Sequence, residues 1–288
     1  MNDFVIITDS ACDIYPSLLE EWDVNLVRLM YRFDHIDRDF ADHEMPIGEF
    51  YQNMRDGHTA KTNAVNIEGF TSAFEPVVAS GKDVLYLGFS SGLSATYMQS
   101  TLAAEDLMKK YPERRIVTVD TLCASAGQGL LVKLAVDKKN SGADLDETAA
   151  YIRETVPHLA HWFTVEDLVY LKRGGRVSPA VALVGSMLSI KPIMHVDDEG
   201  HLIKTGTVRG RKNSLKALAD KLFETALDVE NGVFFISHGD CPEDAATLAD
   251  MIRERGGNQI LVITHVGAVI GAHSGPGTMA LFFVAKQR

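Results

Sequence analysis

The stretch Asp83-Val-Leu-Tyr-Leu-Gly-Phe-Ser-Ser-Gly-Leu-Ser-Ala-Thr-Tyr97 joins a hydrophobic strand, a turn of serine and glycine, and the start of a helix. This order is typical of anion sites in α/β proteins. Small residues let the backbone approach a ligand, and the free N–H groups at the start of a helix favour a phosphate or a carboxylate. Further donors are the hydroxyls of Ser90, Ser91, Ser94 and Thr96. The segment therefore predicts either an anion site or a helix that Ser94 merely caps.

The same residues also match a hydrolase motif. Gly88-Phe-Ser90-Ser-Gly92 fits the pattern G-x-S-x-G, in which Ser90 would be the nucleophile and His273 its base. A catalytic triad also needs an Asp or Glu that orients the histidine, and the spacing of the chain does not identify one. A serine hydrolase is therefore the alternative hypothesis from a different functional class.

Composition narrows the class of protein. A chain of 288 residues suffices for one large domain or two smaller ones. No apolar run approaches the ~20 residues of a membrane span, and the N-terminus lacks the basic start of a secretory signal, so a cytoplasmic location is predicted. Three cysteines without a C-x-x-C pair indicate neither a disulfide framework nor a zinc ribbon.

The chain is strongly acidic overall but contains one basic segment. A net charge of −11 argues against nucleic acid as a partner. One segment opposes this trend, because it holds six basic residues against the single acidic residue Asp220. The six are Lys204, Arg209, Arg211, Lys212, Lys216 and Lys221. The segment is either a contact surface or a solvated helix face.

The order of the expected elements predicts the fold class. Apolar runs at residues 4–8, 84–89 and 116–119 are typical of buried strands. Helical patterns alternate with them at residues 16–22, 94–110, 125–139 and 146–155. This alternation predicts an α/β domain with a mainly parallel sheet that helices cover on both faces.

The second half of the chain has a different pattern. Residues 192–205 predict a hairpin that turns at residues 198–200. Helices at about 214–227 and 243–254 and strands at 233–237, 259–265 and 279–285 follow it. We therefore predict two domains, an N-terminal α/β domain of residues 1–160 and a C-terminal α+β domain of residues 161–288.

In an open α/β sheet the ligand binds beyond the carboxyl ends of the strands. The residues expected to gather there are Asp9-Ser10, Ser90 to Ser94 and Asp120-Thr121, and further candidates lie elsewhere in the chain. Thr62 lies in a loop, and His273 begins the loop His273-Ser-Gly-Pro-Gly277. Arg173 and Arg176 flank a glycine pair and are candidates to pair with an anion or with acidic residues of the other domain. Gly127-Gln-Gly129 lacks the third glycine of a dinucleotide motif, no ATP-binding P-loop motif is present, and no metal site is predicted.

Six stretches, taken together and in order, resemble the DegV family of bacterial fatty-acid-binding proteins. They are Thr8-Asp-Ser10 with Asp13, Ser90-Ser-Gly-Leu-Ser94 with Thr96-Tyr97, Val165-Glu-Asp-Leu-Val-Tyr-Leu-Lys-Arg-Gly-Gly-Arg176, Ser189-Ile-Lys-Pro192, Gly206-Thr-Val-Arg-Gly-Arg211 and His273-Ser-Gly-Pro-Gly277. The family usually has T-S-Q-P-S where this chain has Thr62-Asn-Ala-Val-Asn66, so only the threonine is shared.

The resemblance implies a function and a set of site residues. It implies a two-domain, non-catalytic protein that buries a long-chain fatty acid such as palmitate, stearate or oleate between its two domains, and needs no other cofactor. In characterised relatives, a separate ATP-dependent fatty acid kinase then converts the carboxyl group to acyl phosphate. The residues that resemble carboxylate-binding positions are Thr62, Ser94 and His273. Ser91 and Arg173 resemble the edge of the site, and Arg209 and Arg211 a surface for contact with the kinase or transiently with a membrane. A DegV-like binder of another amphiphilic lipid remains an alternative.

Overall fold

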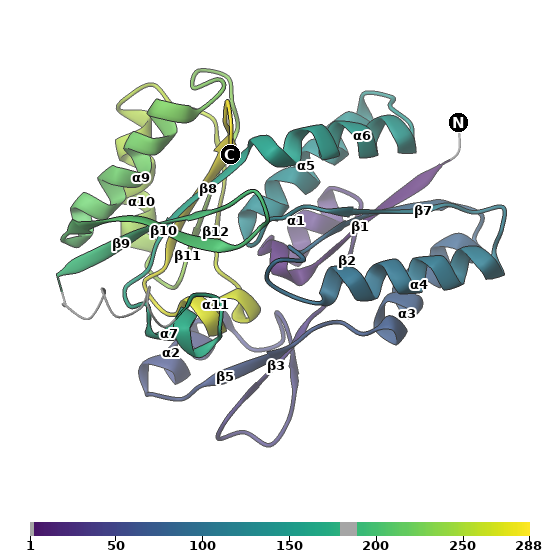
Figure 1. Ribbon diagram of the computed structural model, residues 1–288, viewed down its shortest axis with the longest axis horizontal. Coiled ribbons are helices and arrows are strands. Elements are labelled where there is room, and N and C mark those ends of the chain that lie inside the picture. Colours follow the sequence, from purple (N-terminus) through teal and green to yellow (C-terminus); the bar gives the residue numbers. More distant parts are fainter. Residues whose placement is uncertain (1–2, 179–188) are drawn as a thin grey trace.

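The computed structural model describes residues 3–178 and 189–288, and within these residues the strands form three sheets. The first sheet is parallel throughout, in the order β2-β1-β6-β7 (Figure 1). Its strands are β1 (Phe4–Asp9), β2 (Val24–Val27), β6 (Asp83–Gly88) and β7 (Ile116–Asp120). The predicted strands of the N-terminal half are therefore confirmed, and so is the α/β fold class.

Helices cover both faces of this sheet because alternate strand residues point to opposite sides. Leu85 packs in one core with α5 and α6, whereas Tyr86 packs in another core with α3 and α4. The helical segments of this half are η1 (Ser10–Cys12), α1 (Pro16–Glu21), α3 (Ile67–Ala79), α4 (Thr96–Lys110), α5 (Ala126–Asn140), α6 (Leu145–Thr155) and η2 (Val156–His158). The helices predicted from residues 16, 94, 125 and 146 onward are thus confirmed.

The second sheet is mixed, in the order β10-β9-β8-β13-β11-β12. Its strands are β8 (Leu159–Thr164), β9 (Ile190–Val196), β10 (Leu202–Arg209), β11 (Phe234–His238), β12 (Ile260–His265) and β13 (Met279–Val284). Helices α9 (Arg211–Thr225) and α10 (Pro242–Arg253) share a core with one face of this sheet. The other face contributes Phe282 to the core of α5, so α5 lies between the two sheets. The predicted hairpin is confirmed, because β9 and β10 pair antiparallel.

A third, small sheet was not predicted. It has the order β4-β3-β5 and is formed by β3 (Met30–Phe33), β4 (Phe40–Ala41) and β5 (Ala60–Asn63). Helix α2 (Ile47–Arg55) and the late helix α11 (Ala268–Ser274) share a core with it, and the short helix α7 (Val169–Arg173) contacts α11. Segments from both ends of the chain therefore meet beside this sheet (Figure 1).

The predicted domain boundary falls inside β8, the first strand of the mixed sheet along the chain. The division into domains at residues 160 and 161 stays a prediction. In the part of the chain that the structure describes, no helix has the length and apolarity that crossing a membrane requires.

Candidate functional site

A cavity of about 430 Å³ lies between the carboxyl edge of the parallel sheet and the mixed sheet. Its wall includes Phe89 after β6, Ala124 after β7, Phe163 of β8, Phe282 of β13 and Ile270 of α11. The volume is within the ~300–1,000 Å³ of small-molecule sites. Most of the wall is apolar, with a limited number of polar groups, which is the chemistry that an amphiphilic ligand requires.

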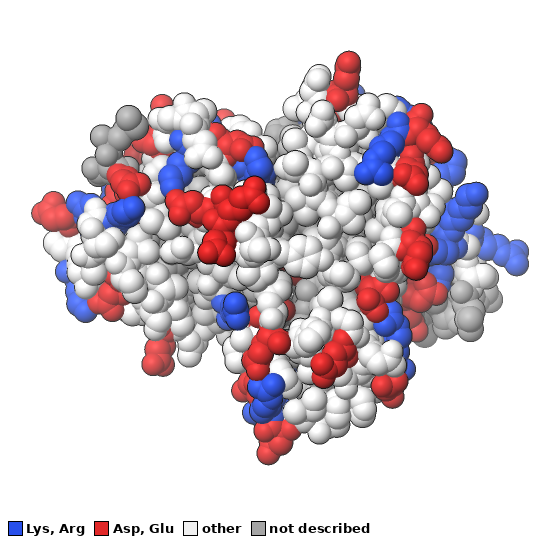
Figure 2. Space-filling model, turned by 180° about the vertical axis from the view of Figure 1, so that it is seen from behind, with Lys and Arg blue, Asp and Glu red and all other residues white. Residues whose placement is uncertain are grey.

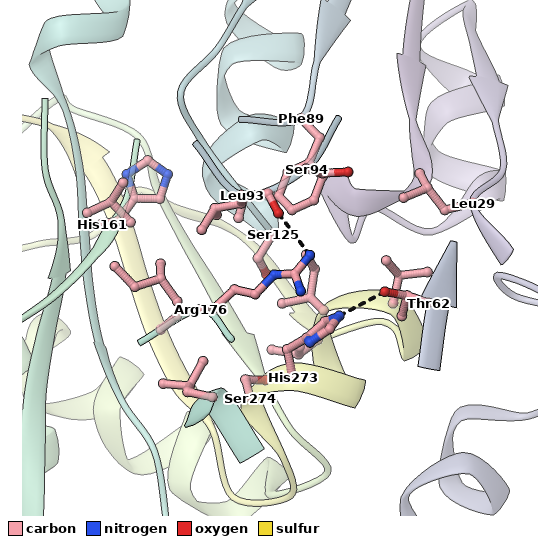
Figure 3. A pocket seen from close by; sticks show the side chains of 18 of the residues that line it. Leu29, Thr62, Phe89, Leu93, Ser94, Ser125, His161, Arg176, His273 and Ser274 are labelled. Atoms are coloured by element: carbon pink, nitrogen blue, oxygen red, sulfur yellow. Dashed lines mark hydrogen bonds between the residues drawn. The ribbon is translucent and has the colours of Figure 1, made fainter. Parts of the chain in front are cut away.

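Thr62 and His273 lie together in this wall. Thr62 is on β5, and its hydroxyl oxygen is 2.8 Å from Nε2 of His273 (Figure 3). Burial and, to a smaller extent, the positive charge of Arg176 lower the pKa of His273 to about 4, so the imidazole is neutral at pH 7. A neutral imidazole carries one N–H, which lets it orient a hydroxyl without placing a second charge in the site.

The prediction that His273 lies in a loop was wrong. His273 is in the last turn of α11, because the apolar residues before it pack against the small sheet and extend the helix to Ser274. Gly275 ends the helix with a φ of 83°, and a Cβ on this residue would lie 2.4 Å from the ring of Tyr170. Gly174 contacts the imidazole so closely that a Cβ added to it would lie 2.1 Å from Nδ1 of His273.

Ser91 and Ser94 also line the cavity. Ser94 Oγ accepts the N–H of Thr96 at 3.2 Å and is 2.9 Å from the Thr96 hydroxyl, so this residue does support the first turn of α4. The two hypotheses for the serine segment are therefore compatible. The N-cap position of α4 is Ala95, so Ser94 supports the helix start from one residue earlier, and from that position its hydroxyl lines the cavity beside the positive end of α4.

Of the two arginines around the glycine pair, Arg176 is the one that lines the cavity. Its guanidinium donates to the carbonyl oxygen of Leu93 at 2.9 Å and to that of Gly174, and Figure 3 shows it between His161 and His273. Burial lowers its pKa. Arg173 does not line the cavity, and its guanidinium lies 5.7 Å from the centre of the Tyr170 ring. Among the described residues, neither arginine has a carboxylate within 4.0 Å.

The structure does not assemble a Ser90–His273 pair. Ser90 is buried and donates to the carbonyl oxygen of Gly200 at 3.0 Å, at the tip of the β9–β10 hairpin. A Cβ on Gly200 would lie 2.2 Å from Ser90 Oγ, so the hairpin tip covers this serine closely. Nε2 of His273 is bonded to Thr62 instead, and within residues 3–178 and 189–288 its Nδ1 has no hydrogen-bond partner that could orient the ring as a base. The geometry therefore gives the hydrolase hypothesis no support.

Two further polar atoms of the wall are buried and have no hydrogen-bond partner among the residues that the structure describes. They are Nε2 of His161 and Oγ of Ser274. Burial keeps the pKa of His161 well below its usual value, so it too is neutral at pH 7. Buried polar atoms are usually satisfied, and these two are therefore candidates to bond a ligand or water. The sequence did not identify His161 as a site residue, because a histidine inside a strand is indistinguishable from an ordinary core residue.

The predicted contact residues differ in their surroundings. Arg209 is exposed at the end of β10. Arg211 is half-buried, and its Nε donates to Asp244 at 2.8 Å. Lys216 and Lys221 are likewise paired with acidic residues of α9. Half of the basic segment, three of its six residues, is thus paired locally. On the face turned away in Figure 1, basic and acidic side chains lie intermixed around a largely uncharged centre (Figure 2).

Comparisons with known proteins agree with this architecture. The family model described as "Uncharacterised protein, DegV family" matches residues 3–286. The chain belongs to the DegV family. A DegV domain-containing protein of Clostridium perfringens is 44% identical over 100% of this chain and 99% of its own length.

Two of the solved structures with this fold are of fatty-acid-binding proteins. A fatty-acid-binding DegV family protein from Thermus thermophilus has a TM-score of 0.89 and 26% identity, and the match covers 99% of this chain and 100% of that one. A stearic-acid-binding protein from Eubacterium ventriosum has a TM-score of 0.89 and 25% identity, with 98% of each chain covered. The predicted family is confirmed.

Proposed function

We propose that this DegV protein binds one long-chain fatty acid in the cavity and holds its carboxylate at Thr62, Ser94 and His273. The observation that carries the proposal is the Thr62–His273 hydrogen bond in the wall of an apolar cavity, beside the guanidinium of Arg176. When Nε2 carries the imidazole proton, it donates to Thr62 Oγ1, and the threonine hydroxyl then donates to the carboxylate. Related DegV proteins that bind fatty acids support the ligand class.

The energetics suit this ligand. Each buried CH₂ stabilises the complex by ~0.8 kcal/mol, so a chain of roughly 16 carbons contributes on the order of 12 kcal/mol before ordering costs. An unpaired buried carboxylate would cancel much of that gain. Hydroxyl donors, the start of α4 and a nearby guanidinium provide the compensation that a buried anion needs.

We further propose that the protein is a cytoplasmic carrier without catalytic activity of its own, and that a separate ATP-dependent kinase phosphorylates the bound carboxyl group. Palmitate, stearate and oleate are the expected ligands. Ser91 lines the cavity and serves as an edge residue, and Arg176 takes the role at the cavity that the resemblance suggested for Arg173. Arg209 is the exposed member of the predicted contact surface, whereas Arg211 already has an acidic partner.

Calorimetric titration of the delipidated protein with stearate and with its methyl ester tests the proposal. Stearate should bind one per chain and more tightly than the ester, because the ester has the same alkyl chain but no charge for the hydroxyls to stabilise. Equal affinities for stearate and its ester would indicate a site for an uncharged amphiphile instead of a fatty-acid site. A serine-directed fluorophosphonate probe should leave Ser90 unlabelled, and labelling would restore the hydrolase hypothesis.

A further inference from the structure

Asp34, His35 and His58 form a cluster outside the cavity, next to the small sheet. Asp34 and His35 follow β3, and His58 precedes β5. Among the described residues, this is the one group of three His, Cys, Asp or Glu side chains whose donor atoms all lie within 4.8 Å of one another. The three side chains are between 34% and 47% exposed, so a cation has access from solvent.

The distances within the cluster fit a shared cation better than hydrogen bonds. Oδ1 of Asp34 is 3.5 Å from Nδ1 of His35 and 3.5 Å from Nδ1 of His58. An N–H···O hydrogen bond is usually about 2.7–3.2 Å long. Two ligands that each lie ~2.0–2.1 Å from a tetrahedral zinc ion are about 3.3–3.4 Å apart, which is close to both observed separations.

One of the three donors, the Asp34 carboxylate, is held in place by its neighbours. Oδ2 of Asp34 accepts the Thr59 hydroxyl at 2.8 Å and the Thr59 N–H at 3.1 Å, which leaves Oδ1 facing the imidazoles. The backbone N–H of Asp34 donates to the carbonyl oxygen of Thr59 at 2.9 Å and continues the β3–β5 ladder. This support of the carboxylate by the two Thr59 donors is typical of metal ligands. The imidazole rings stack with their centres 3.6 Å apart, whereas two imidazoles on one tetrahedral ion have their centres about 5 Å apart, so the rings must swing apart when the ion binds.

We propose that Asp34, His35 and His58 bind a divalent transition-metal ion of the zinc class, with water in the remaining position. Two imidazole nitrogens and one carboxylate oxygen suit Zn²⁺, Cu²⁺, Ni²⁺ or Co²⁺, and they are unsuited to Ca²⁺ or Mg²⁺, which prefer oxygen ligands throughout. Three protein ligands leave an open coordination position.

The ion would connect two strands of the sheet that carries Thr62. Thr59 immediately precedes β5, and Thr62 is three residues further along the same strand, about 10 Å away at the usual rise per residue. The metal therefore joins the start of β5 to the end of β3 without entering the cavity. It should stabilise the folded protein, because it binds only when these segments are paired.

Equilibrium dialysis against Zn²⁺ tests the proposal, with tag-free, chelator-treated protein and metal analysis as the readout. Co²⁺ absorption in the visible range serves as a second, spectroscopic readout. We expect one zinc ion per chain in the wild type and none in the His35→Ala/His58→Ala double variant at the same free Zn²⁺ concentration. Each single variant should bind more than ~10-fold more weakly, since even loss of a supporting partner of a ligand typically costs that much.

His201→Ala is the matched control, because His201 is an exposed histidine 3.7 Å from the carboxylate of Asp197 but lacks a third ligand. It should retain one zinc ion per chain. Zn²⁺ should also raise the melting temperature of the wild type and of the control, but not that of the double variant. In metal-free buffer, the double variant should bind stearate with the same affinity as the wild type. Absence of stoichiometric zinc in the wild type, or equal zinc in the double variant, would overturn the proposal.

Discussion

Replacement of Thr62 by valine should weaken fatty-acid binding without disturbing the shape of the cavity. Valine has nearly the same size as threonine but no hydroxyl, so the change removes the group that His273 orients at 2.8 Å. A hydrogen bond to a charged group contributes ~1.5–3 kcal/mol. Loss of that bond corresponds to a Kd that is roughly 10- to 150-fold higher.

Calorimetry with stearate is the assay, and Thr62→Ser is the control because it keeps the hydroxyl. The serine variant should bind nearly as tightly as the wild type. His273→Ala should weaken binding by a similar factor to Thr62→Val, and the double variant should be little worse than either single one, because the two residues act through one hydroxyl.

The methyl ester of stearate provides the internal reference. It has no carboxylate, so the wild type and Thr62→Val should bind it with the same affinity. Unchanged stearate affinity in both Thr62→Val and His273→Ala would show that the carboxylate lies elsewhere in the cavity, and Arg176 would then be the first residue to test. Strictly additive effects would refute the relay from His273 through Thr62.

Three further predictions concern pH, packing and the basic surface. The pKa of His273 is about 4 in the folded protein, against an ordinary value of 6.5. Its contribution to stability is therefore complete above pH 6.5 and is lost as the pH falls toward 4. In denaturant unfolding, the His273→Gln variant should lose less stability than the wild type over this pH range. Gly174→Ala should displace the imidazole and raise the Kd for stearate at least ~10-fold, whereas Gly48→Ala, with nothing within 4 Å of the added Cβ, should leave it unchanged. Arg209→Ala should slow stearate transfer to anionic vesicles at low salt but not at high salt, and Lys216→Ala, whose charge is already paired, should not; equal rates in both variants would assign the surface no role.

Three of the four strands of the parallel sheet, β1, β6 and β7, could be predicted because local sequence determines them, whereas β2, with only four residues, was missed. The β6 strand and the helix after it have a continuous apolar run, a small-residue turn and a helical pattern within one stretch. The small sheet was missed for the opposite reason. Its strands are short, β4 has two residues, and α11 from the other end of the chain completes its core. No local pattern contains that contact.

The residues of the site could likewise be predicted only in part. The resemblance placed Thr62, Ser94 and His273 at one location, and all three line the cavity. The residues alone could not choose between Arg173 and Arg176, because both flank the same glycine pair. The resemblance suggested Arg173, whereas the fold places Arg176 in the cavity wall. Nor could it indicate Asp34 with His58, since their proximity arises from the pairing of β3 with β5 across an intervening helix.

Mass spectrometry of the intact protein, purified under native conditions and followed by lipid extraction, tests the central claim most directly. The account predicts a mass increase equal to one fatty acid per chain and recovery of acids in the range from myristic to stearic acid. The bound fraction should fall in the Thr62→Val variant. A protein that carries no acyl chain, and that also fails to bind these acids when they are added, would contradict the account.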